Sequence, residues 1–127
     1  MPVIKRPKFF LTDFGVYPVD ILVTIGTTEA EVLAKLKNGC HYKPDQEEIR
    51  NLNFKGKSGY TLRLKGGACI LWIKEYRPGL LAHEIFHLVS LLYERIGSKF
   101  YVDDDEPVAY LIEFLTNRIY KGMNLNS

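Results

Sequence analysis

The segment Leu80–Val89, which reads LLAHEIFHLV, places two histidines and a glutamate inside an otherwise apolar run. The apolar pattern begins after Pro78-Gly79 and ends before Gly97. It predicts one long helix over residues 80–96. Because this helix is apolar on most sides, we expect it to lie at the centre of the domain. Burial without partners would cost free energy, so the sequence predicts that something binds the polar residues His83, Glu84 and His87.

The segments around this helix alternate between strand and helix patterns. Residues 20–25 form a nearly continuous β-branched run, which is typical of a strand covered on both faces. Thr28 and Glu31 have the spacing of a capping box and predict a helix start. We expect a strand or ordered arm at 9–16, a strand at 20–25, a hairpin formed by 60–64 and 68–73, and helices at 29–37, 46–52 and from 103–107 to 121. This order predicts an α+β fold with a small mixed or antiparallel sheet packed on the 80–96 helix and the helix that follows it.

Composition places the chain among globular proteins. Of its 127 residues, 46% are hydrophobic and 13% aromatic, which is enough for a single packed domain over residues 1–127. The net charge is only +2 and the basic residues are scattered, so we expect no nucleic-acid partner. The sequence shows neither the apolar core of a signal peptide nor a charge-free run of membrane-spanning length. The two isolated cysteines, Cys40 and Cys69, favour a reducing compartment, and one disulfide between them is the alternative. We therefore expect a cytoplasmic protein without a membrane partner.

The spacing within HEIFH is suited to metal chemistry. His83 and His87 are four residues apart on the predicted helix, so their side chains share one face, one turn apart. Two imidazoles in this arrangement can occupy two corners of a zinc tetrahedron. Glu84 can reach a zinc-bound water and act as its general base without binding the metal. This HExxH pattern is typical of zinc metallopeptidases. The alternative is a plain core in which each of the three side chains has its own local partner.

A catalytic zinc needs a third protein ligand and one open position. A returning helix could bring back Glu106, for which the alternatives are Asp103, Asp104 and Asp105. We expect Glu106 as the ligand, because the aspartates suffice to place negative charge at the helix N-terminus. Tyr110 lies one turn after Glu106 on the same face, where its phenol can donate to a developing oxyanion. A partly buried core tyrosine is the equal alternative for Tyr110.

Two further features concern partners and metal binding. The strand at 68–73 leads into the 80–96 helix, and we expect it at the exposed edge of the sheet, where an extended peptide could pair with its backbone over the metal. Ordinary sheet packing is the alternative for its hydrophobic residues. Cys40 and His41 could contribute to a structural zinc site, but the spaced ligand pairs of such sites are missing.

HEIFH followed after a short loop by residues 104–111 (DDEPVAYL) resembles the small zincin-like metallopeptidases encoded by phages and prophages, which are similar to reduced gluzincins. The resemblance extends over residues 68–120. It implies a zinc cofactor held by His83, His87 and Glu106, with Glu84 as general base. The chain departs from larger gluzincins in having Tyr110 where those often have an aspartate, and in lacking the length for their C-terminal subdomain. A looser similarity is to the repressor-cleaving zincins of mobile elements.

The sequence therefore predicts a cytoplasmic, zinc-dependent metallopeptidase that cuts a peptide or protein substrate, with Glu84 and Tyr110 as catalytic residues. If a phage or prophage encodes the chain, the compartment is the cytoplasm of the host cell. The alternative is a non-catalytic zincin-like phage protein, in which the metal is structural and the domain binds a partner or assembles in a virion. An open metal position favours the enzyme, and a fourth protein ligand favours the alternative. The sequence leaves the substrate, its cleavage preference and the oligomeric state open.

Overall fold

Strands and helices follow one another along the chain in the computed structural model, which describes residues 7–15, 17–38, 44–97 and 106–125. The strands are β1 (Lys8–Phe14), β2 (Tyr17–Ile25), β3 (Gly59–Arg63) and β4 (Cys69–Ile73), and the helices are α1 (Glu29–Asn38), α2 (Gln46–Asn51), α3 (Pro78–Ile96) and α4 (Glu106–Leu125). Within the described residues, the predicted elements and the mixed α+β class are confirmed, and residues 103–105 of the predicted last helix lie outside the described residues. Among the described helices, none combines the length and the apolar character that crossing a membrane requires.

The four strands form one mixed sheet in the order β1-β2-β4-β3. β1 and β2 are antiparallel, β2 and β4 are parallel, and β4 and β3 are antiparallel. β4 therefore lies inside the sheet, with a partner on each side. The prediction that the 68–73 strand forms the exposed edge is wrong, because β2 covers the side of β4 that β3 leaves free. The edges of the described sheet are β1 and β3.

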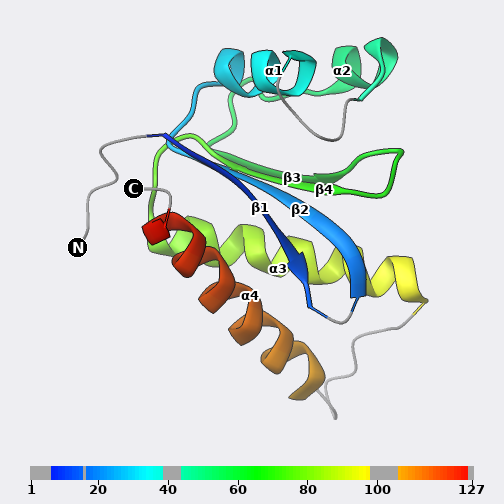
Figure 1. Cartoon of the computed structure of the whole chain (residues 1–127), viewed down its shortest axis with the longest axis vertical. Helices are drawn as coiled ribbons and strands as arrows, with labels where there is room; N and C mark the ends of the chain where they lie inside the picture. The colour runs from blue at the N-terminus through cyan, green and yellow to red at the C-terminus, as the bar shows by residue number, and fades with distance from the viewer. Residues whose placement is uncertain (1–6, 16, 39–43, 98–105, 126–127) are drawn as a thin grey trace.

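Two helical layers cover the sheet, one on each face (Figure 1). α1 and α2 lie on one face, and α3 and α4 lie on the other. Successive residues of a strand point to opposite faces, so β2 and β4 supply both cores. Ile21, Val23 and Leu71 belong to the core under α3 and α4, whereas Ile70 and Trp72 belong to the core on the opposite face. This two-sided burial explains why the β2 segment is a nearly continuous apolar run.

The start of α1 has the predicted capping box. The N–H of Thr28 donates to Oε1 of Glu31 at 3.1 Å, and the N–H of Glu31 donates to Oγ1 of Thr28 at 3.2 Å. The indole N–H of Trp72 donates to the carbonyl oxygen of Thr27 at 3.0 Å. The capping box fixes the first turn of α1, and the Trp72 bond attaches the residues just before this turn to the internal strand β4.

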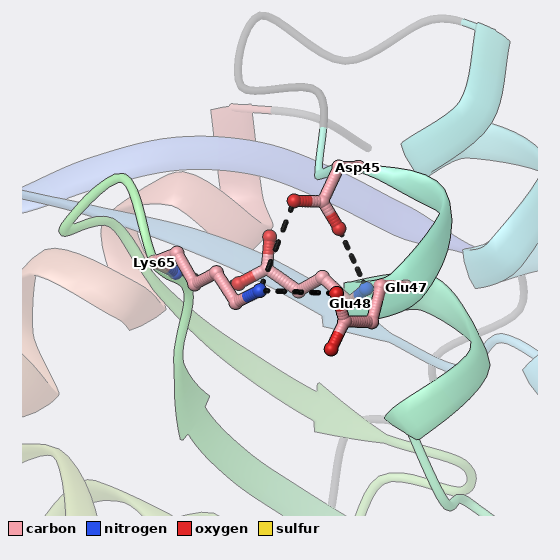
Figure 2. Close-up of polar contacts among 4 residues, drawn as sticks. All are labelled: Asp45, Glu47, Glu48 and Lys65. Atoms are coloured by element: carbon pink, nitrogen blue, oxygen red, sulfur yellow. Dashed lines mark hydrogen bonds and ion pairs between the residues drawn. The ribbon is translucent and has the colours of Figure 1, made fainter.

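A charged cluster attaches α2 to the turn between β3 and β4 (Figure 2). Asp45 caps α2 by accepting the N–H of Glu48 at 2.7 Å. The ammonium of Lys65 lies 3.8 Å from Asp45 and 3.9 Å from Glu47, and its backbone N–H donates to Glu48. These side chains satisfy one another, so we interpret the cluster as structural.

α3 and α4 pack antiparallel on the other face. Near the start of α3, the Tyr76 hydroxyl lies 2.6 Å from the hydroxyl of Tyr120, which is close to the end of α4. Toward the end of α3, Tyr93 lines a common hollow with Pro107 and Tyr110 from the first turns of α4. The N-terminus of α4 therefore lies beside the C-terminal half of α3, as Figure 1 also shows.

Candidate active site

The HEIFH segment turns only one of its polar side chains toward the core. Glu84 is buried, with 4% of its surface exposed. His83 and His87 lie on the exposed side of α3, and the side chain of His83 is 64% exposed. The expectation that α3 buries both histidines is therefore wrong, because the helix covers the sheet with one face and presents the other to solvent. Within this segment, only Glu84 requires an internal partner.

The Nε2 atoms of the two histidines face each other across 3.1 Å. The ring centroids are 4.7 Å apart and the ring planes are inclined by 75°. Two imidazoles bound to zinc at about 2.0–2.1 Å in tetrahedral geometry hold their nitrogens about 3.3 Å apart. The separation of the Nε2 atoms of His83 and His87 is thus close to one edge of a zinc tetrahedron. Without a metal, one ring nitrogen donates a hydrogen bond to the other across this distance.

Strand β3 provides the surroundings of the buried Glu84 carboxylate. The Thr61 hydroxyl donates to Oε1 of Glu84 at 2.6 Å. A methyl group on Gly59 would lie 3.0 Å from Oε2 and 3.1 Å from Cδ of Glu84, so the glycine leaves just enough space for the carboxylate. Oε2 lies 3.9 Å from Nε2 of His83. Thr61 thus holds one carboxylate oxygen, while the other lies on the side of the histidine pair.

β3 is an edge strand whose free backbone groups belong to the same residues that surround Glu84. Two hydrogen bonds at the ends of the β3–β4 pairing show which residues of β3 bond to β4. Lys74 N–H donates to Ser58 C=O at 2.9 Å, and Leu64 N–H donates to Ala68 C=O at 2.8 Å. Hydrogen-bonded pairs alternate along an antiparallel ladder, so the intervening odd-numbered residues direct their N–H and C=O groups away from β4. These residues are Gly59, Thr61 and Arg63, and their side-chain positions lie on the α3 face of the sheet.

The structure does not bring Glu106 or Tyr110 to the histidines. Glu106 is exposed at the first position of α4. Tyr110 is 66% exposed and shares its hollow with Tyr93. Tyr93 lies six residues beyond His87, about 9 Å further along the helix at a rise of about 1.5 Å per residue. α3 extends well past HEIFH, so an antiparallel α4 begins at the far end, and the predicted oxyanion role of Tyr110 gains no support from this arrangement.

The two hollows described for this surface differ in chemistry. One, of about 350 Å³, lies beside the histidine pair and is lined by Arg77, Gly79, Leu80 and His83. The other, of about 480 Å³, lies at the opposite end of α3, and half of its lining residues are aromatic, including Tyr17, Tyr93 and Tyr110. The donor atoms of HEIFH, rather than the size of a hollow, therefore identify the candidate site.

Within the part of the chain that the structure describes, no group of three or more His, Cys, Asp or Glu side chains is arranged to hold a metal ion. HEIFH supplies two histidine donors and a carboxylate beside them, and Glu106 does not join them. The other residues considered for metal binding, Asp103, Asp104, Asp105, Cys40 and His41, lie outside the described residues. The chain matches no family model, no curated protein and no solved structure.

Gly59 and Thr61 were not predicted from the sequence to belong to the site. The alternation of β3 does place residues two apart on one face of a strand. It does not show which side chain of which helix lies opposite that face. Only the packing of α3 against β3 reveals that both residues surround Glu84.

Proposed function

We propose that the chain is a metal-dependent hydrolase that cuts peptide bonds, with His83 and His87 as metal ligands and Glu84 as general base. One observation carries this proposal: two Nε2 atoms 3.1 Å apart on an exposed helix face, with a buried carboxylate oxygen 3.9 Å from one of them. Neutral imidazoles are ordinary zinc donors, and a carboxylate at their side is a proton acceptor within reach of the same position.

The separation of the two histidine Nε2 atoms fits zinc. Catalytic zinc sites carry three protein ligands, whereas the described residues supply two. We therefore assign His83 and His87 and name no third ligand. The role that the sequence predicts for Glu106 can be tested directly. Because α4 begins at the far end of α3, we expect Glu106→Ala to retain the zinc affinity of the wild type.

A zinc ion would supply Lewis acidity, which polarises a peptide carbonyl and acidifies water. The contribution of the chain is proton transfer at Glu84. Its Oε1 accepts the Thr61 hydroxyl, which leaves Oε2, on the His83 side, to take a proton from the attacking water. As the new C–O bond forms and the peptide C–N bond breaks, Glu84 returns this proton to the leaving nitrogen.

An extended peptide paired with β3 is the substrate geometry that best suits this arrangement. The outward N–H and C=O groups of Gly59, Thr61 and Arg63 can bind such a peptide, which would run about 4.8 Å from β3. The peptide would then lie along the flank of α3 that carries Glu84. We therefore propose that a peptide substrate pairs with β3 and not with the strand at residues 68–73.

The exposure of the histidines favours an open, catalytic site over a purely structural one. Structural zinc sites are closed by four protein ligands. The side chain of His83 is 64% exposed, and His87 lies on the same exposed side of α3, so the pair is open to solvent. These features support the enzyme over the alternative of a binding module stabilised by its metal.

Glu84→Gln tests the catalytic assignment. The amide oxygen of glutamine can still accept the Thr61 hydroxyl, but the amide cannot take a proton from water. We expect hydrolysis of a fluorogenic peptide library by the zinc-loaded protein to fall by about 100-fold or more, as the loss of a general base typically causes. Zinc affinity should stay within about threefold of the wild type, which is under about 1 kcal/mol.

Glu94→Gln is the matched control, because it makes the same change at an exposed position of the same helix. It should retain full hydrolysis. Wild-type rates in Glu84→Gln would contradict the assignment of Glu84 as general base.

A further inference from the structure

We propose that Thr61 is a positioning residue, which holds the general base with its hydroxyl and takes up the substrate with its backbone. The inference deepens the proposed function and rests on it. Thr61 lies in the middle of β3, and its Oγ1 donates to Oε1 of Glu84 at 2.6 Å. The two residues are 23 positions apart in the chain, so this contact is a product of tertiary packing.

Two neighbours on β3 confine the Glu84 carboxylate. Thr61 holds Oε1, while the space that a side chain would occupy at Gly59 is taken by Oε2, Cδ and Cγ of Glu84, at 3.0–3.1 Å. Glu84 is only 4% exposed, so bulk water is poorly placed to replace the Thr61 hydroxyl. The hydroxyl therefore selects one orientation of the carboxylate, with Oε2 on the side of His83.

The backbone of Thr61 links this orientation to substrate binding. Its N–H and C=O groups point away from β4, toward the free edge at which a peptide would pair. One residue thus contacts the peptide through its backbone and the base through its side chain. Loss of the hydroxyl should leave peptide pairing intact and disturb only the base, so we expect kcat to fall while KM stays constant.

The test compares Thr61→Val with Thr61→Ser in steady-state hydrolysis of the best peptide from a fluorogenic library. We expect Thr61→Val to lower kcat at least tenfold with KM within twofold, and Thr61→Ser to restore kcat to within threefold of the wild type. Thr116→Val is the matched control, because the Thr116 hydroxyl donates to the Ile112 carbonyl within α4, away from the site. Unchanged kcat in Thr61→Val, or equal losses in Thr61→Val and Thr61→Ser, would overturn the positioning role. If Thr61→Val does not fold, Thr61→Ala replaces it.

A second readout separates this inference from the proposed function. In protein labelled with carbon-13 at glutamate side chains, the signal missing from Glu84→Gln identifies the Glu84 carboxyl carbon. We expect Thr61→Val to move this signal and Thr61→Ser and Thr116→Val to leave it in place. If the signal moves but the protein hydrolyses no peptide, the proposed peptidase function is overturned, while the Thr61–Glu84 hydrogen bond is supported. An unmoved signal would overturn the positioning role, whether or not the protein is a peptidase.

Discussion

At the scale of single residues, helix α3 separates the polar side chains of HEIFH by burial. Glu84 faces β3 and is shielded from water, and the Thr61 hydroxyl satisfies a carboxylate whose burial alone would be costly. His83 and His87 lie on the opposite side of the helix and are exposed to solvent. The sequence predicts which residues share a side of the helix. It does not predict which side is buried, because apolar residues surround HEIFH on both sides.

The buried thiol of Cys69 should make the free energy of unfolding decrease at alkaline pH. Burial in β4 raises the pKa of its thiol from 9.0 to about 11. The folded state therefore holds this proton more tightly than the unfolded chain, so the stabilisation is complete below pH 9 and is lost as the pH rises to 11. We expect the free energy of unfolding, measured by urea titration, to fall by roughly 2–3 kcal/mol over this range.

Cys69→Ala should remove most of this decline between pH 9 and 11. Burial and the hydrogen bond with Tyr120 raise the pKa of Tyr76 to about 12. Tyr76→Phe should therefore reduce the decline in the free energy of unfolding above pH 10. An equal slope in Cys69→Ala and the wild type between pH 9 and 11 would refute the role of the thiol.

At the scale of elements, the parallel pairing of β2 with β4 determines which strand of the hairpin keeps a free edge. The predicted hairpin of β3 and β4 is confirmed, but a hairpin does not show which of its strands gains a further neighbour. The burial pattern of the side chains distinguishes the internal strand from the edge strand. Every residue of β4 is buried, as in an internal strand, whereas the residues of β3 are half-buried or exposed, as at an edge.

Helix α4 meets β1 at a point where only glycine fits. A methyl group on Gly122 would overlap the ring of Phe10, with two ring carbons at 2.7 Å. Helix propensity alone would make alanine the better residue by about 1 kcal/mol, but overpacking costs about 1–3 kcal/mol. The difference between these two terms leads us to expect that Gly122→Ala lowers the free energy of unfolding by up to about 2 kcal/mol in urea titration.

Gly79→Ala in the first turn of α3 is the matched control, since nothing lies within 4 Å of the added methyl group. It should leave stability unchanged or raise it by up to about 1 kcal/mol. If both alanine variants were equally stable, the contact between α4 and β1 would not be as close as described.

At the scale of the whole molecule, the three layers bring an HExxH helix against the edge strand of a mixed sheet. Local patterns such as the capping box at Thr28 and the apolar run of β2 were enough to predict the type of each element. The relation between α3 and α4 was not predictable in this way. It depends on how far α3 extends beyond His87 and on the direction in which α4 returns, and the antiparallel return leaves Glu106 at the far end.

The most direct test of the proposed site is zinc binding, measured by isothermal titration calorimetry on protein purified without a nickel column. The wild type is compared with His83→Ala, His87→Ala and His41→Ala, which changes the third histidine of the chain. We predict one zinc ion per chain in the wild type and in His41→Ala, and at least tenfold weaker binding, about 1.4 kcal/mol or more, in the other two variants. No binding to the wild type, or undiminished binding to His83→Ala and His87→Ala, would contradict a metal site at HEIFH.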